Sequence, residues 1–388
     1  MKTPLLPGAT LGVLGGGQLG RMFVHEAQRM GYHTLVLDPD RQSPAGLVSH
    51  HHVCADYTDA DALAELARRC DAVTTEFENV PAAALAELAR HRPVSPRAEA
   101  VAVAQDRVAE KAHFVRCGVA VAPYAVIERE ADLDSVDAGL LPGILKTARL
   151  GYDGKGQIRV DTRAALAAAW AQLGRVGCVL EQRLPLAAEC SVIVARGHDG
   201  ASVHLPVQRN LHRDGILALT EVWPGNVEPT LAREVTEAAH AVAQGLGYVG
   251  VLCVEFFVLQ DGRWVVNEIA PRPHNSGHHS QDACDVSQFE LQVRCMAGLP
   301  LVAPRLHSAA AMLNLLGDIW RGPQADDPAC VPRWDQVLAL PGAHLHLYGK
   351  HEARAGRKMG HLNLTAESPE AVRRAAVQAA ACLGIAPF

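Results

Sequence analysis

Two apolar segments, each carrying an acid, decide how the chain is interpreted: Val251-Leu-Cys-Val-Glu-Phe-Phe-Val258 and Trp264-Val-Val-Asn-Glu-Ile269. The turn sequence Gln-Asp-Gly at 260–262 lies between them and predicts a β-hairpin. In such a hairpin Glu255 and Glu268 could converge on one face. Buried acids are costly unless they are paired or metal-bound, and Mg²⁺ takes carboxylate and amide oxygens. Glu255, Asn267 and Glu268 therefore form a candidate magnesium site, unless the acids simply face water.

The segments around this hairpin predict an α+β region with antiparallel sheets, because strands are close together and helices are few. Strands are expected at 144–148, 157–160, 178–182, 191–195, 202–207 and 250–259, and helices at 163–173 and 231–246. Further strands are expected at 309–316, 343–348 and near 362–364, before a closing helix at 369–383.

Residues 10–95 follow a different rhythm, in which short apolar runs alternate with amphipathic helical patterns. Strands are expected at 10–14, 34–37 and 72–75, and helices at 18–30, 59–69 and 81–90. This alternation predicts a parallel, doubly wound sheet. The segment His91-Arg-Pro-Val-Ser-Pro96 breaks the rhythm and marks a domain edge.

The first predicted strand ends in a glycine turn, in which Gly15, Gly17 and Gly20 fit the pattern G-x-G-x-x-G and Asp38 closes the next strand. This pattern is typical of dinucleotide-binding folds. However, the physics requires only that an anion can approach the first N–H groups of a helix. The turn could bind a dinucleotide, bind another phosphate ligand, or be a tight turn without a ligand.

A second glycine-rich segment, Gly151–Gln157, follows Lys146 and separates two predicted strands. We call it the flap. Its glycines and lysines suit a loop that covers a polyphosphate, although it lacks the Lys-Ser or Lys-Thr of a Walker A loop. The alternative is a polar hairpin loop. Glu181 and Glu189 flank the next loop, and alone they would be interpreted as surface acids.

Two further polar segments could contribute to a site. After Glu268, the loop 270–279 offers Arg272, Asn275 and Ser276 to a ligand. Its prolines and Gly277 disfavour the helix that a zinc site with His274 and His278 would need. The second segment is a cluster of four cations that could clamp a phosphate or form a solvated basic hairpin. They are Lys350, Arg354, Arg357 and Lys358. His50-His51-His52 is expected in a solvated loop.

Composition limits the classes of function. The 388 residues are 49% hydrophobic and 20% charged, with a net charge of −6. These values predict a soluble globular chain of two or three domains, and they disfavour a dedicated nucleic-acid or membrane-surface binder. No run approaches 18 uncharged apolar residues, and prolines interrupt the first residues before a signal-peptide core. Ten scattered cysteines without Cys-x-x-Cys are expected to be buried, reduced thiols, so we expect a cytoplasmic protein.

The order of these features resembles the ATP-grasp fold, and the flanking segments resemble the 5-(carboxyamino)imidazole ribonucleotide synthase family. The segments that carry the resemblance include Gly15–Met22, Thr75–Asn79, Ala104–Arg107, Gly151–Gln157, Asn210–Leu217, Asn267–His278, Ser287–Glu290 and Gly356–Asn363. The resemblance runs from about residue 10 to 385. It implies ATP- and bicarbonate-dependent carboxylation of 5-aminoimidazole ribonucleotide through carboxyphosphate, in purine synthesis.

The resemblance also implies an α/β and α+β architecture in three domains. A Rossmann-like domain at 1–105 is followed by an ATP-grasp domain at 106–304, with a mobile lobe at about 118–182, and by a small domain at 305–388. A homodimer and small-molecule partners are implied, without nucleic acid or membrane. The implied cofactor is MgATP, with Mn²⁺ as a possible substitute for Mg²⁺.

By family position, residues of four kinds are assigned. ATP would be held by Arg107, Lys146, Gly151, Tyr152, Asp153, Gly154, Lys155, Gly156, Gln157, Glu181, Gln182, Arg183, Leu184, Glu189, His212, Asn267 and Glu268. The metal would be held by Glu255 and Glu268, and Tyr152, Asp153, Lys155 and Lys350 would act in catalysis. The ribonucleotide would contact Gln18, Leu19, Glu76, Asn79, Arg272, Asn275, Ser276, Lys350, Arg357 and Lys358. Position 155 departs from the family, which usually has Arg there, so a bidentate fork is lost.

Three alternatives remain from the sequence: another ATP-grasp carboxylase or ligase, an NAD-dependent dehydrogenase built on the glycine turn, and a non-catalytic nucleotide sensor. The presence of Lys146, Glu255, Asn267 and Glu268 disfavours the sensor.

Overall fold

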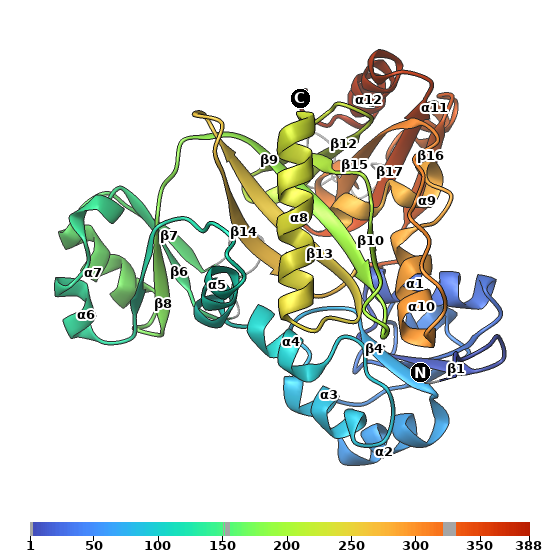
Figure 1. The fold of residues 1–388 in the computed structure, drawn as a ribbon. Helices are drawn as coiled ribbons and strands as arrows, with labels where there is room; N and C mark the ends of the chain where they lie inside the picture. Colours follow the sequence, from blue (N-terminus) through green and yellow to red (C-terminus); the bar gives the residue numbers. More distant parts are fainter. Residues whose placement is uncertain (1–2, 150, 152–155, 321–330) are drawn as a thin grey trace.

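The computed structural model describes residues 3–149, 151, 156–320 and 331–388. These residues form three sheets (Figure 1). Among them, no helix has both the length and the apolar character needed to cross a bilayer. The cysteines in this part of the chain are free, and most are buried, but Cys54 is exposed, contrary to expectation.

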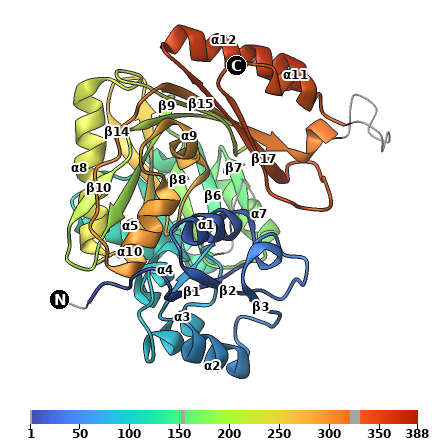
Figure 2. The ribbon, with the colours of Figure 1, turned by 90° about the vertical axis from the view of Figure 1, so that its right-hand side faces the viewer.

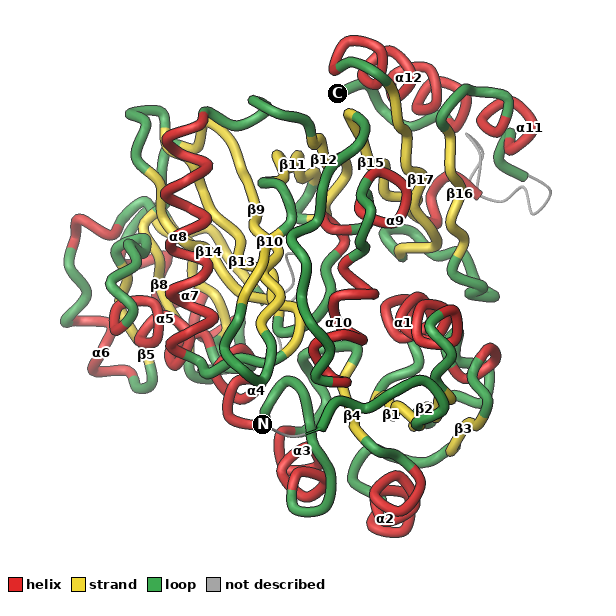
Figure 3. The backbone as a smooth tube through the Cα atoms, turned by 45° about the vertical axis from the view of Figure 1, so that its right-hand side comes forward, coloured by secondary structure: helices red, strands yellow, loops and turns green. Residues whose placement is uncertain are grey.

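The first sheet is parallel, in the order β3-β2-β1-β4, as the alternating pattern predicts. Its strands are β1 (Thr10–Leu14), β2 (His33–Leu37), β3 (His51–Val53) and β4 (Ala72–Thr75). The strand β3 corrects the expectation of a solvated loop at His50–His52. Helix α1 (Gln18–Arg29) covers one face, and α2 (Ala60–Arg69) and α3 (Ala82–Ala89) cover the other (Figure 3). Both faces are therefore buried, which explains the apolar runs of β1, β2 and β4.

The second sheet is antiparallel, in the order β5-β8-β6-β7, and belongs to a lobe that stands apart on the left of Figure 1. Its strands are β5 (Tyr124–Ile127), β6 (Gly143–Thr147), β7 (Gln157–Val160) and β8 (Cys178–Gln182). Helices α6 (Glu130–Asp134) and α7 (Arg163–Gln172) pack against it. Helices α4 (Ala98–Ala104) and α5 (Arg107–Arg116) connect this lobe to the parallel domain. The sequence did not predict β5 because its four residues are too few to show a strand period.

The third sheet has nine strands in the described part of the chain, in the order β14-β13-β9-β11-β12-β15-β17-β16, with β10 paired to β9. Its strands are β9 (Leu186–Arg196), β10 (Ser202–His204), β11 (Gln208–Arg213), β12 (Ile216–Val222), β13 (Gly250–Leu259), β14 (Trp264–Ala270), β15 (Ala309–Leu316), β16 (Ala343–Leu347) and β17 (Lys358–Ala366). The predicted hairpin is confirmed as β13–β14, with Glu255 opposite Glu268. The strands β11 and β12 were missed: β11 has only one apolar residue, and β12 is mostly apolar but does not alternate strictly with polar residues.

Helices cover this large sheet at three places. α8 (Pro229–Gly245) begins with a proline in its first turn and is capped by Glu228. α9 (Ser280–Ala283) and α10 (Gln288–Ala297) follow β14, and α10 packs against both α1 and β13. α11 (Trp334–Leu338) and α12 (Pro369–Leu383) lie over β15–β17 at the top of Figure 2. Because β12 pairs with β15, the sheet is continuous across residue 304, and the C-terminal strands are fixed relative to the hairpin that carries the acids.

Candidate functional site

The glycine turn between β1 and α1 is occupied by carboxylates of the chain itself. The N–H of Gly16 donates to Oδ2 of Asp38 at 2.7 Å. The N–H groups of Gly17 and Gly20 donate to the two carboxylate oxygens of Glu76, at 2.9 and 3.0 Å. A Cβ at Gly17 would lie 2.3 Å from Oε1 of Glu76, so this close approach requires glycine. The donors that a dinucleotide phosphate would use in this turn are taken by protein side chains, which disfavours the dehydrogenase alternative.

A cleft of about 400 Å³ opens beside this turn. The chain brings cations to it from two distant segments: Arg272 from the loop after β14, and Lys350, Arg357 and Lys358 from the end of the chain. The first N–H groups of α1, at Gln18 and Leu19, have no acceptor within their own helix, and both residues line this cleft. An anion can therefore meet main-chain donors on one wall and side-chain cations on the other.

Most residues assigned to the ribonucleotide lie together in this first cleft. They are Gln18, Leu19, Glu76, Arg272, Asn275, Lys350, Arg357 and Lys358. Asn79 lines the second cleft instead. Ser276 is fully buried, and its hydroxyl accepts from Ser191 at 2.8 Å, so the structure places it beneath the site. Arg354 pairs with Glu352 and does not line the cleft.

A second cleft of about 460 Å³ lies between the antiparallel lobe and the large sheet. It gathers all the described residues that were assigned to ATP and the metal. They are Arg107, Lys146, Gly151, Gly156, Gln157, Glu181, Gln182, Arg183, Leu184, Glu189, His212, Glu255, Asn267 and Glu268. The assigned residues Tyr152, Asp153, Gly154 and Lys155 lie outside the described residues.

In this cleft, two lysines hold one carboxylate. Nζ of Lys146 donates to Oε2 of Glu181 at 3.0 Å, and Nζ of Lys111 lies 3.2 Å from Oε1. Burial opposes ionisation of Glu181, but the two ammonium groups hold its pKa below the usual range. Burial lowers the pKa of Lys111. Lys111 lies on α5, in a segment that contains no recognisable motif, so the sequence analysis did not identify it as a site residue.

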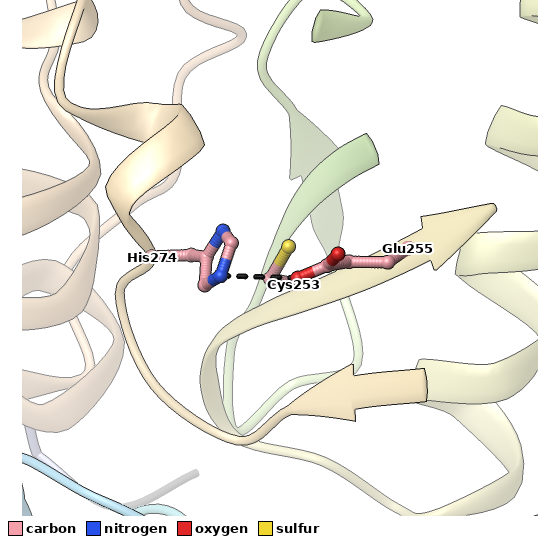
Figure 4. Close-up of side chains that lie close together, drawn as sticks. All are labelled: Cys253, Glu255 and His274. Atoms are coloured by element: carbon pink, nitrogen blue, oxygen red, sulfur yellow. Dashed lines mark ion pairs between the residues drawn. The ribbon is translucent and has the colours of Figure 1, made fainter. Parts of the chain in front are cut away.

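The acids of the hairpin are also paired. Oε2 of Glu268 accepts from Arg107 at 3.0 Å. Oε1 of Glu255 lies 3.1 Å from Nε2 of His274, the contact drawn in Figure 4. Burial opposes ionisation of Glu255, but His274 and the neighbouring cations bring its pKa to about 2. His212 and Glu189 form a similar pair, with 2.6 Å between Nδ1 and Oε2.

The residues present fit a hard divalent cation. Glu255 and Glu268 lie opposite each other on β13 and β14 and line the same cleft. Oδ1 of Asn267 is buried and has no hydrogen-bond partner in the described structure. Two carboxylates and one unsatisfied amide oxygen form the donor set that Mg²⁺ prefers, with phosphate oxygens and water completing its shell.

Glu110 is a further buried acid that the sequence did not reveal. Its Oε1 accepts from the N–H of Ile269, next to Glu268, at 2.8 Å. Burial and the nearby charge of Glu268 raise the pKa of Glu110 to about 8. Glu110 therefore supports the end of the acidic strand β14 from α5.

The loop after β14 forms the wall between the two clefts. Glu78, Arg272, His274, Asn275 and Lys358 line both of them. Nε of Arg272 donates to Glu78 at 2.5 Å. Burial opposes ionisation of Glu78, but the guanidinium brings its pKa to about 2.

Gln288 at the start of α10 fixes this loop. It accepts from the N–H of His274 at 2.9 Å, and it donates to the carbonyl of His274 and to Nδ1 of the buried His278. The opposite nitrogen of His278 lies 3.1 Å from Oδ1 of Asn275. His278 is thus part of the support of the loop, and the described structure does not group it with His274 as a metal pair.

Family models match three consecutive parts of the chain. A ribonucleotide synthetase preATP-grasp domain matches residues 8–105, an ATP-grasp domain matches 112–289, and a phosphoribosylaminoimidazole carboxylase C-terminal domain matches 310–375.

Similar proteins cover nearly the whole chain. An N5-carboxyaminoimidazole ribonucleotide synthase from Brucella melitensis is 44% identical, over 93% of this chain and 97% of the relative. The N5-carboxyaminoimidazole synthetase from Staphylococcus aureus complexed with ADP has a TM-score of 0.89 and 36% identity, over 98% of each chain. The N5-carboxyaminoimidazole synthase from Aspergillus clavatus in complex with ADP and 5-aminoimidazole ribonucleotide has a TM-score of 0.87 and 30% identity, over 97% of this chain and 99% of that one.

Three findings lead to one assignment: the paired acids and lysines of the second cleft, the cations of the first cleft beside the glycine turn, and relatives that match from end to end. This chain belongs to the N5-carboxyaminoimidazole ribonucleotide synthase family of ATP-grasp ligases.

Proposed function

We propose that this protein uses ATP and bicarbonate to carboxylate the amine of 5-aminoimidazole ribonucleotide, giving the N5-carboxyamino ribonucleotide, ADP and phosphate in purine synthesis. The observation that carries the proposal is the pair of adjoining clefts with a common wall. One cleft has the acids and lysines that suit a metal–triphosphate, and the other has the donors that suit a nucleotide monophosphate. A group activated in the cleft that suits the metal–triphosphate can reach an amine in the cleft that suits the monophosphate, because the two clefts share lining residues.

In the ATP cleft, Lys146 and Arg107 are positioned to bind phosphate oxygens by leaving their carboxylate partners. Glu255, Glu268 and Oδ1 of Asn267 would hold Mg²⁺ or Mn²⁺, which neutralises charge on the transferring phosphoryl group. The end of β8, with Glu181 and Gln182, and the following residues Arg183 and Leu184 would hold the base. Glu189 and His212 would bind the ribose.

In the ribonucleotide cleft, the phosphate would lie between the N–H groups of Gln18 and Leu19 and the cations Arg357 and Lys358. Glu76 cannot move to the ligand without losing its hydrogen bonds to two N–H groups, so its carboxylate would stay in place beside the ligand. Asn275 and Arg272 would orient the imidazole side, together with Asn79 from the neighbouring cleft.

The flap and Lys350 would complete the reaction. Bicarbonate is a poor electrophile, and its phosphorylation gives carboxyphosphate, which delivers CO₂ to the amine. We assign Tyr152, Asp153, Lys155 and Lys350 to this step, with Lys155 offsetting charge in place of the usual Arg. A closed flap would keep water from the intermediate.

We further propose the division into residues 1–105, 106–304 and 305–388, a homodimer and a cytoplasmic location. The family models support the division because their limits fall near these boundaries.

ADP release, measured by a coupled assay with each substrate omitted in turn, tests the function. The proposal expects turnover that requires both bicarbonate and the ribonucleotide. ADP release that is independent of the ribonucleotide, or saturable enhancement of NADH fluorescence, would contradict it.

A further inference from the structure

Three side chains of different chemistry meet beside the acidic hairpin. Cys253 and Glu255 are two residues apart on β13, so they point to the same face of the sheet. His274 approaches them from the loop after β14 (Figure 4). One ligand atom from each residue lies within 4.8 Å of the other two, and the imidazole and carboxylate atoms are only 3.1 Å apart.

This donor set differs from the one expected to hold magnesium. Mg²⁺ prefers oxygen ligands, whereas a thiolate, an imidazole and a carboxylate together favour Zn²⁺ and similar thiophilic cations. In a tetrahedral zinc site with bonds of about 2.0–2.3 Å, ligand atoms lie about 3.5 Å apart. The three side chains therefore need shifts of about 1 Å to surround such an ion. Glu268 stays outside this set, because it is held by Arg107.

The charges of the three groups also suit a divalent cation in a buried place. Cys253 is fully buried and Glu255 is largely so. A thiolate and a carboxylate would balance the two positive charges, with His274 as a neutral third ligand. On binding, the thiol proton leaves to solvent and the sulfur lone pair forms the bond to the metal.

We propose that Cys253, Glu255 and His274 form an inhibitory site for Zn²⁺ or a similar thiophilic divalent cation. Occupancy would take Glu255 away from the catalytic metal and stop phosphoryl transfer. The inhibitory effect rests on the proposed function, but binding itself does not. Binding and inhibition are therefore tested separately.

Binding is tested with Co²⁺ alone, which gives a sulfur-to-cobalt charge-transfer band in the near ultraviolet when a thiolate is a ligand. The full-length protein should show this band at one equivalent, and Cys253→Ala and Cys253→Ser should both lose it. Cys295→Ala is the matched control, because Cys295 is also fully buried but lies outside the cluster, and it should keep the band. The same band in Cys253→Ala, or no band in the wild type, would overturn the proposed site whether or not the protein has the proposed activity.

Inhibition is tested with Zn²⁺ titrated at saturating ATP, bicarbonate and ribonucleotide. Cys253 contacts no substrate in the proposed function, so Cys253→Ala should keep its basal kcat. The Zn²⁺ concentration that halves its activity should be about tenfold higher than for the wild type, because one of three protein ligands is lost. Added Mg²⁺ should relieve inhibition of the wild type. Equal Zn²⁺ sensitivity in wild type and Cys253→Ala would overturn the inhibitory role.

Discussion

The two clefts hold their carboxylates in different ways. In the ribonucleotide cleft, main-chain N–H groups at the start of α1 hold Glu76. In the ATP cleft, side chains hold the acids: Lys146 holds Glu181, Arg107 holds Glu268 and His274 holds Glu255. Main-chain donors cannot move without unfolding the helix start, whereas side chains can change partners. The first arrangement therefore gives a rigid surface, and the second lets ATP and metal replace existing partners.

This difference also explains why the ATP cleft carries so many charges. Removing one partner from a buried ion pair is costly because the other charge stays uncompensated. When Lys146 turns to a phosphate, Lys111 still neutralises Glu181. When Arg107 turns away from Glu268, a bound metal would neutralise that acid. Each exchange keeps opposite charges together.

The largest expected effect concerns Glu268, one of the acids of the ATP cleft that can change partners. Glu268→Gln should lower kcat by about 100-fold or more, because metal-based charge stabilisation is worth several kcal/mol. Steady-state kinetics with circular dichroism as a fold check would measure this. Glu26→Gln, which alters an acid paired with Arg29 away from the clefts, should be close to wild type. Near-normal turnover in Glu268→Gln would remove it from the metal site.

The next effect tests whether the clefts bind different substrates. Arg357→Ala should raise the KM for the ribonucleotide by about 10-fold or more, since a charged hydrogen bond contributes about 1.5–3 kcal/mol. The KM for ATP should change much less, because Arg357 lines only the first cleft. Varying each substrate in turn provides the comparison. If the KM for ATP rises most, the C-terminal cations belong to the ATP site.

A smaller effect tests the rigidity of the ribonucleotide cleft. In Gly17→Ala the new Cβ would displace Glu76 from its N–H donors, at a cost of about 1–2 kcal/mol. The KM for the ribonucleotide should rise several-fold, and thermal stability should fall. Gly139→Ala is a suitable control, because its Cβ would meet no atom closer than 3.4 Å. Unchanged ribonucleotide binding in Gly17→Ala would show that Glu76 can move freely.

The smallest effect concerns the wall between the clefts. The pKa of Glu78 is lowered to about 2 in the folded protein, so its pair with Arg272 stabilises the fold above pH 4.5 and is lost as the pH falls toward 2. At pH 3.5 the loss should be roughly 1 kcal/mol. Urea unfolding at pH 7 and pH 3.5 would measure it, with Glu78→Gln showing a smaller difference between the two pH values than the wild type. An equal difference in both proteins would mean that the pair does not contribute.

Much of the architecture could be predicted from the pattern of apolar residues and turn residues along the sequence. The alternating apolar runs of residues 10–75 predicted β1, β2 and β4, because strands buried on both faces read as continuous apolar segments. The turn at 260–262 predicted the hairpin and placed Glu255 near Glu268, since antiparallel pairing follows from a short connection. Strand β5 was missed although it is apolar, because four residues are too few to show a period. Strand β11 was missed because it has only one apolar residue, and in β12 the apolar residues do not alternate strictly with polar ones.

The sequence by itself determined the strand, turn and helix signals and the chemistry of the hairpin, because these depend on residues near one another in the chain. Only the tertiary structure decided that Glu76 fills the glycine turn, 56 residues from Gly20. It also decided that Lys111 on α5 meets Glu181, that Glu110 on α5 meets the end of β14, and that His274 meets Glu255 and Cys253. These contacts join segments that fold separately and meet only when the sheets pack. The spacing of residues along the chain therefore does not predict which buried charged groups will pair.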